Sequence, residues 1–109
     1  MPKFLLQVNF NQEAAKKLIE DGGTKRAAAV QELLRQQEAR LESLYFSPQN
    51  DGPDAFAIIE VPVGGADALG VIALAGRSGG IKVTARRIFT PEELDKVAAK
   101  SKGVPVPGK

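Results

Sequence analysis

Residues 55–88 read AFAIIEVPVGGADALGVIALAGRSGGIKVTARRI, and this stretch decides the fold. Its first part, residues 55–61, is dense in Ala, Ile and Val and predicts a buried strand, which Pro62 ends. Residues 66–76 predict a helix, and two glycines then lead into a last strand over residues 81–89. A strand, a helix and a strand in this order favour a sheet that is covered by helices.

The helix predicted at residues 66–76 is unusual in its composition. No charged side chain lies between Asp67 and Arg77. A helix that is apolar on all sides must be buried on all sides, whereas in a chain of 109 residues one helix face normally meets water. We therefore expect this helix to contact another subunit.

Upstream of this stretch, the sequence predicts two more strands and a helix in two pieces. Apolar residues alternate with polar or mixed positions over residues 3–10, and the chain switches to a further strand over residues 41–47. A loop is expected at residues 48–54, where Pro, Asn and Gly cluster. Between the two strands, Asn11 is a good helix N-cap, and Gly-Gly at residues 22–23 breaks the helix.

Downstream, residues 90–93 read TPEE and combine a capping Thr, a Pro at the first helical position and a Glu placed for a capping box. This pattern predicts a short helix that ends near residue 100. Pro105 and Pro107 then prevent a helix. We therefore expect one domain over residues 1–100 and an extended C-terminal tail over residues 101–109.

The order of the predicted elements indicates the architecture. Strand, helix, strand, strand, helix and strand is the βαββαβ plan of a ferredoxin-like fold. We predict an α+β sandwich with a four-stranded antiparallel sheet and helices on one face only. The helix-free face carries polar side chains among apolar neighbours, and its members include Leu5, Gln7, Asn9, Tyr45, Thr84 and Arg86. Because this face is too apolar for water and too polar for a dry core, we expect two sheets to face each other in a dimeric α/β barrel.

The composition excludes several kinds of chemistry. The chain has no cysteine and no histidine, which excludes a thiol nucleophile, an iron–sulfur cluster, a histidine-rich metal site and a Ser-His-Asp triad within it. We therefore expect no metal and no cofactor. The formal net charge of +2 is too small to indicate nucleic acid, and no apolar run is long enough to span a membrane. We expect a cytoplasmic protein whose partner is another copy of itself.

The motifs, taken in this order, resemble the GYD-domain family within the dimeric α/β-barrel superfamily. The resemblance covers about residues 2–100. Its motifs are PKFLLQ at 2–7, GGTKR at 22–26, LYF at 44–46 and TPEE at 90–93. The Gly-Tyr-Asp tract for which the family is named reads Gly52-Pro53-Asp54 here, so the role of that Tyr is missing from this chain.

The resemblance implies the fold and self-association more than it implies a function. The wider superfamily includes cofactor-free monooxygenases, isomerases, haem-degrading enzymes and small ligand-binding domains. Members that hold a metal or haem typically need a His, which is absent here. Three functions stay open: binding of a small organic ligand between facing sheets, cofactor-independent monooxygenase or isomerase activity, and a structural or regulatory module without a ligand.

The sequence offers two candidate sites. The ligand-binding candidates of the helix-free face are Gln7, Asn9, Tyr45, Asp54, Thr84 and Arg86. Tyr45 and Arg86 could orient an oxygenated aromatic molecule or an acid, and Asp54 could act as a general base if burial raised its pKa. The alternative interpretation is that these groups hydrogen-bond one another and water inside an interface between subunits.

The second candidate site comprises Thr24, Lys25 and Arg26 at the start of the second helical piece. A hydroxyl, two cations and free N–H groups could converge on a bound anion there. The alternative interpretation is a glycine helix break followed by two solvated cations.

Overall fold

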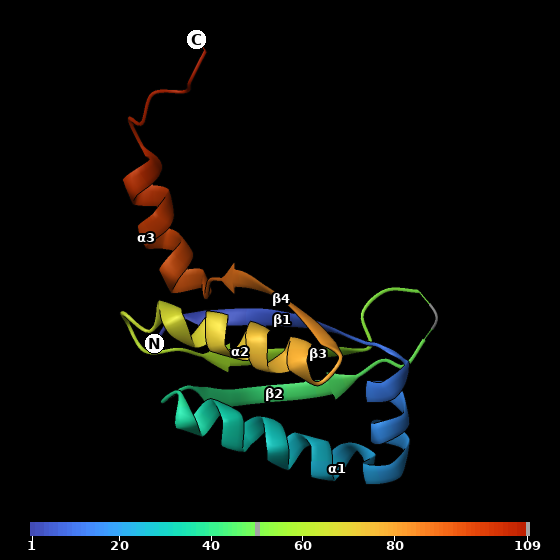
Figure 1. Ribbon diagram of the computed structural model, residues 1–109. Helices are drawn as coiled ribbons and strands as arrows, with labels where there is room; N and C mark the ends of the chain where they lie inside the picture. Colours follow the sequence, from blue (N-terminus) through green and yellow to red (C-terminus); the bar gives the residue numbers. More distant parts are fainter. Residues whose placement is uncertain (50, 109) are drawn as a thin grey trace.

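The computed structural model describes residues 1–49 and 51–108. A four-stranded antiparallel sheet in the order β2-β3-β1-β4 carries two helices on one face (Figure 1). The elements are β1 (Lys3–Phe10), α1 (Gln12–Gln36), β2 (Arg40–Phe46), β3 (Ala55–Glu60), α2 (Ala66–Ser78), β4 (Ile81–Ile88) and α3 (Pro91–Ser101). The predicted α+β, ferredoxin-like fold is confirmed. Asn50 of the predicted loop and Lys109 of the predicted tail lie outside the described residues.

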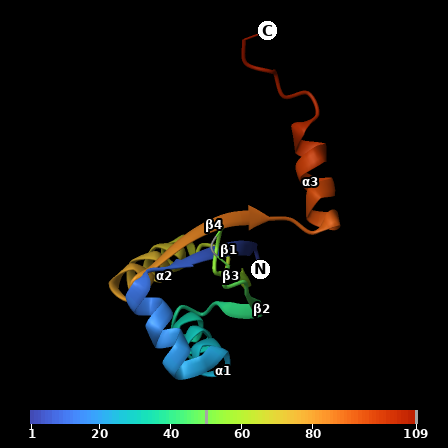
Figure 2. The same ribbon diagram turned by 90° about the vertical axis from the view of Figure 1, so that its right-hand side faces the viewer.

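Helix α1 is kinked at Gly22, as the glycine pair in the sequence predicts. The Asn11 side chain caps the first turn, since its Oδ1 accepts a hydrogen bond from the Ala14 N–H at 2.9 Å. At Gly22 the backbone has φ 78° and ψ 169°, a combination that is essentially restricted to glycine. The bend lets the second half of α1 run along β2 (Figures 1 and 2).

The register of the strands decides which side chains share a face of the sheet. Gln7 of β1 lies opposite Phe56 of β3 on one side and Thr84 of β4 on the other. Phe56 in turn lies opposite Tyr45 of β2. Because directly opposed residues point to the same face, Tyr45, Phe56, Gln7 and Thr84 form one row across the helix-free face.

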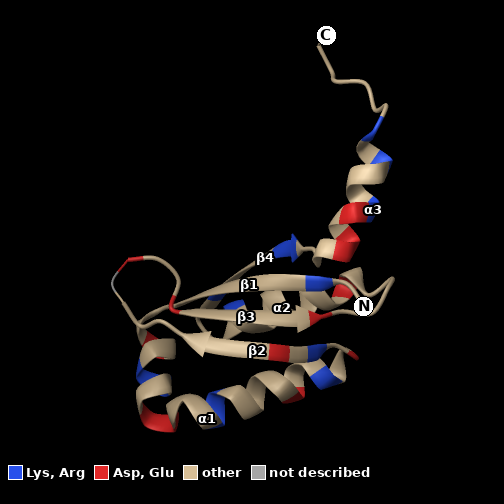
Figure 3. Ribbon diagram, turned by 180° about the vertical axis from the view of Figure 1, so that it is seen from behind, with Lys and Arg blue, Asp and Glu red and all other residues tan. Residues whose placement is uncertain are grey.

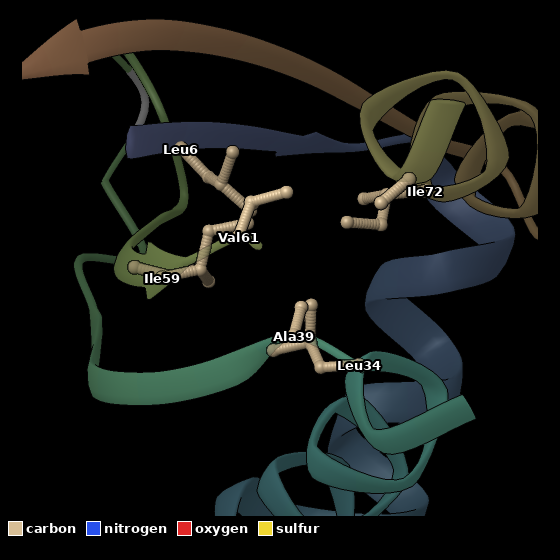
Figure 4. Packing of buried hydrophobic residues seen from close by; sticks show 8 residues of the cluster. Leu6, Leu34, Ala39, Ile59, Val61 and Ile72 are labelled. Atoms are coloured by element: carbon tan, nitrogen blue, oxygen red, sulfur yellow. The ribbon is translucent and has the colours of Figure 1, made fainter. Parts of the chain in front are cut away.

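The hydrophobic core lies between the sheet and the two helices α1 and α2. Ile59 and Leu34 are the most completely buried large side chains, with exposed fractions of 0% and 1%. Leu6 and Val61 join them from the sheet side, and Ile72 closes the cluster from α2 (Figure 4). Complete burial of one such aliphatic side chain contributes about 1.5–3 kcal/mol, so this cluster is the main source of stability.

Helix α3 stands apart from both faces of the sheet (Figures 1 and 2). The predicted capping box is confirmed: Thr90 Oγ1 accepts from the Glu93 N–H at 3.1 Å, and Glu93 Oε1 accepts from the Thr90 N–H at 2.9 Å. No residue of α3 is buried, although Leu94 and Val97 are apolar. The helix is therefore held by its own caps and not by a core.

Helix α2 covers the sheet with one face and leaves the opposite face open in the single chain. Ala68 and Ile72 are buried, whereas Val71 and Leu74 on the outer side are exposed, Leu74 to 67%. This exposure is what a contact with another subunit would remove, and that contact, which would be separate from one between two helix-free faces, stays a prediction.

Candidate functional site

The helix-free face has an apolar centre. Leu5 of β1 lies opposite Ile58 of β3, and Gln7, next along β1 on this face, lies opposite Phe56. Leu5, Phe56 and Ile58 are each only half-buried, because neighbouring strands shield them from the sides while no helix covers them from above. Figure 3 views the molecule from this side, with α2 behind the strands.

Four of the six predicted ligand-binding residues lie together on β1 and β4. Gln7 is opposite Thr84, and Arg86 is opposite Leu5, one step along the same face. Thr84 Oγ1 makes a long hydrogen bond of 3.5 Å to the Gln7 carbonyl oxygen. Asn9 lies on the same face, two residues beyond Gln7 toward the end of β1.

Tyr45 lies on the same face but apart from this group. It occupies the edge strand β2, and Phe56 separates it from Gln7. Its side chain is 71% exposed, so the hydroxyl is free to meet a ligand or a second subunit.

Asp54, the sixth candidate, is already engaged by the backbone. Its Oδ2 accepts a hydrogen bond from the Phe10 N–H at 2.8 Å, and its own N–H donates to the Val8 carbonyl at 2.8 Å. Its carbonyl oxygen accepts from the Ser47 N–H at 2.7 Å. Asp54 thus joins the ends of β1, β2 and β3, and a role as general base stays a prediction.

A cluster of charges at one end of the helix-free face was missed by the sequence analysis. Arg40 Nη2 donates to Glu60 Oε1 at 2.7 Å, and Lys3 Nζ lies 2.5 Å from Glu42 Oε1 and 4.0 Å from Glu60 Oε1. The hydrogen bond from Arg40 lowers the pKa of Glu60 below its usual value of 4.5. One signal was available: Glu60 ends an apolar run in phase with Ile58, which places a carboxylate at the end of the helix-free face.

The three anion-site candidates point to different surroundings. Lys25 is exposed, and its Nζ lies 3.4 Å from Asp21 Oδ1 one turn earlier in α1. Arg26, the next residue, is half-buried, and its Nε is shielded from water. Thr24 is exposed. The structure therefore does not bring the two cations to one point.

A cavity of about 100 Å³ lies on the helix-covered side, between the sheet and the helices α1 and α2. Its lining is apolar apart from one side chain, Arg26, and includes Val8, Val30, Ile72 and Val83. This cavity contains none of the six candidates of the helix-free face, so the two regions are separate.

Neither a metal-ligating cluster nor a membrane-spanning helix is found among the described residues. In residues 1–49 and 51–108, no group of three or more His, Cys, Asp or Glu side chains is arranged to hold a metal ion. Within the same residues, none of the helices combines the length and the apolar character that a membrane span requires. The expected absence of a cofactor stays a prediction.

Comparison with known proteins identifies the family. A search of curated proteins finds no match. The model of the GYD domain matches residues 4–98, from the start of β1 to the body of α3. This match covers most of the chain and includes all the motifs that carried the resemblance except the first two residues of the opening strand motif. The chain therefore belongs to the GYD-domain family.

Proposed function

We propose that the protein is a homodimer in which the helix-free faces of two copies meet, and that it binds a small organic molecule between them. The observation that carries this proposal is the apolar centre of that face, Leu5, Phe56 and Ile58, which none of the described residues covers. Uncovered apolar patches with a polar rim typically mark interaction or ligand sites. A second copy would shelter both centres and leave the polar rims to line the space between them.

Helix α3 supports self-association independently. Its apolar side chains Leu94 and Val97 are three residues apart and share one side of the helix, yet neither is buried. An amphipathic helix needs a surface for its apolar side, and α3 stands away from its own sheet (Figure 2). We infer that this side packs on the partner copy.

The polar rim favours an acidic or oxygenated ligand. Arg86 takes part in none of the ion pairs of the described residues, so its guanidinium is free to bind a carboxylate or a similar group. Tyr45 offers a hydroxyl from the opposite edge of the sheet, and Gln7 and Thr84 lie between the two edges. A small acid or an oxygenated aromatic molecule matches this set.

The other two functions have weaker support. The residue considered as a catalytic base, Asp54, uses its carboxylate to bind the Phe10 N–H, and no other observation favours an oxygenase or isomerase. A structural module without a ligand would differ only in that side chains fill the space between the sheets. The ligand experiment below separates this case from the proposal.

Self-association is tested with Ile58→Glu, which places a carboxylate at the centre of the helix-free face. Sedimentation velocity should show a dimer for the wild type and a monomer for this variant, with unchanged far-UV circular dichroism because Ile58 is outside the core. The matched control is Val63→Glu, which changes an exposed apolar residue between β3 and α2 and should leave the dimer intact. A monomeric wild type, or a dimeric Ile58→Glu, would contradict the proposal.

Ligand binding is tested by native mass spectrometry of untreated protein. We expect a dimer that carries an extra mass, and we expect Arg86→Met to lose this mass while remaining a dimer. Dimers without any added mass, together with side chains that fill the space between the sheets in a crystal structure, would favour the structural module instead.

A further inference from the structure

The cavity on the helix-covered side is separate from the proposed dimer interface and has its own chemistry. It is formed by three layers: Val30 and Leu34 of α1, Val8 and Val83 of the sheet, and Ile72 of α2. The kink at Gly22 sets the direction of the second half of α1 (Figures 1 and 2). The cavity is therefore a consequence of how α1 lies beside the sheet.

Arg26 is the charged residue of this lining, and its hydrogen bonding is incomplete. Its Nε is inaccessible to water and has no hydrogen-bond partner, the one buried side-chain nitrogen or oxygen of this kind among the described residues. A buried donor without an acceptor is unfavourable, and more so when the group is charged. No carboxylate of the described residues forms an ion pair with Arg26.

We propose that this cavity binds a short-chain carboxylic acid, with the carboxylate at Arg26 and the hydrocarbon tail among the apolar side chains. A guanidinium offers only donors, and a carboxylate offers acceptors in matching geometry. The apolar walls, in contrast, offer no partner to a second polar group. A ligand with one charged end and an apolar remainder satisfies both parts of the site.

The volume limits the length of the tail. A dry apolar cavity of about 150 Å³ accommodates the six carbons of a benzene ring, so the ≈ 100 Å³ available here corresponds to a tail of about four to five carbons. Hexanoate is a suitable probe, with acetate as a probe that lacks most of the tail and 1-hexanol as one that lacks the charge.

The site is tested by titrating methyl-labelled protein with hexanoate and recording the NMR shifts of Val30, Leu34 and Ile72. We expect these methyl groups to shift in a saturable way with hexanoate, and to shift much less with acetate or 1-hexanol. Shifts confined to Leu5 and Ile58 on the helix-free face would overturn this proposal while supporting the function proposed above. No saturable shift with hexanoate would overturn it as well.

Separate substitutions test the contribution of the Arg26 charge and the contribution of the cavity volume to hexanoate binding. Arg26→Met keeps an apolar chain of similar length and should weaken hexanoate binding about tenfold or more, whereas Arg35→Met, an exposed arginine of the same helix, should bind like the wild type. Val30→Phe should fill the cavity and abolish binding while leaving Arg26 in place. Equal affinity in Arg26→Met and Arg35→Met, or unchanged binding by Val30→Phe, would refute the site.

Discussion

The two faces of the sheet differ in how far this chain completes them. Ile59 faces α1 and α2 and is 0% exposed, whereas its neighbour Ile58 faces away from the helices and is only half-buried. One face therefore has a core made from its own chain, and the other has apolar side chains at its centre and charges at its end. Neighbouring apolar residues of β3 therefore have different surroundings: Ile59 stabilises the fold, and Ile58 is available for the proposed association.

The largest expected effect distinguishes these two isoleucines. Ile59→Ala should lower the free energy of unfolding by about 3 kcal/mol, because it removes buried methyl groups and leaves a cavity. Ile58→Ala should cost less, about 1–2 kcal/mol in dilute protein, and should in addition weaken self-association. Urea denaturation at low and high protein concentration measures both effects; equal losses that do not depend on concentration would erase the distinction.

The kink in α1 depends on the backbone conformation of Gly22. Gly22→Ala should lower the stability by about 2 kcal/mol, because Ala cannot adopt the backbone angles found there without strain. Apart from its chain neighbours and the backbone of α1 itself, no atom of the described residues lies within 4 Å of the added methyl group, so the loss would come from the backbone alone. The control is Gly23→Ala, whose methyl group would make an ordinary contact of 3.4 Å with Phe46. If both variants unfold at the same urea concentration, the kink is not what positions α1.

Helix α3 covers neither face of the sheet in its own chain. A change in its N-cap should therefore affect stability less than the substitutions in β3 and α1, and only within the helix. Thr90→Ala removes the N-cap, which should destabilise the helix locally by about 1 kcal/mol. In dilute, monomeric protein this change should increase amide hydrogen exchange in α3 without changing the melting temperature, because no residue of α3 is buried. A clear fall in the melting temperature of the monomer would show that α3 packs on its own sheet.

The charges on the surface predict the response to acid. Hydrogen bonds from Arg40 and from the Thr90 backbone lower the pKa values of Glu60 and Glu93, and Arg35 lowers the pKa of Glu32 from 4.5 to about 2. Below pH 4.5 these carboxyl groups are protonated in the unfolded chain while they are still ionised in the folded chain. The unfolded chain therefore binds more protons, and the stability of the fold falls as the pH falls.

This acid response is measured by thermal melting at a series of pH values. The Glu60→Gln variant should lose less stability than the wild type as the pH falls below 4.5, since one of the three carboxyl groups with a lowered pKa is gone. Identical curves for the two proteins would show that the pairing with Arg40 contributes nothing at low pH.

Much of the fold followed from local patterns, and what was missed depends on long-range register. Alternation identified the strand at residues 3–10, and the capping box identified the start of α3. Each of these signals is contained within a few consecutive residues. The charge cluster was missed because Lys3 and Glu60 meet only through the pairing of β1 with β3. The bulge between Leu41 and Ser43 likewise has no local signal in the sequence.

The candidate sites, like the fold, were predicted only where the signal is local in the sequence. Gln7, Thr84 and Arg86 were placed on one face by strand alternation, and the structure brings them together. The grouping of Lys25 with Arg26 followed from their adjacency in the chain. Adjacent residues of a helix lie about 100° apart around its axis, however, so one meets water and the other meets the core. The cavity beside Arg26 depends on the bend of α1 and could not be foreseen.

The association of two helix-free faces is tested most directly by an intermolecular distance. The chain has no cysteine, so Ser43→Cys introduces a single site for a spin label on the helix-free face, and Ser78→Cys does the same at the end of α2. Because facing sheets lie about 10 Å apart, we expect electron–electron dipolar coupling to report a short intermolecular distance for the Ser43 label and a longer one for the Ser78 label. A monomer without coupling, or a shorter distance for Ser78, would contradict sheet-to-sheet association.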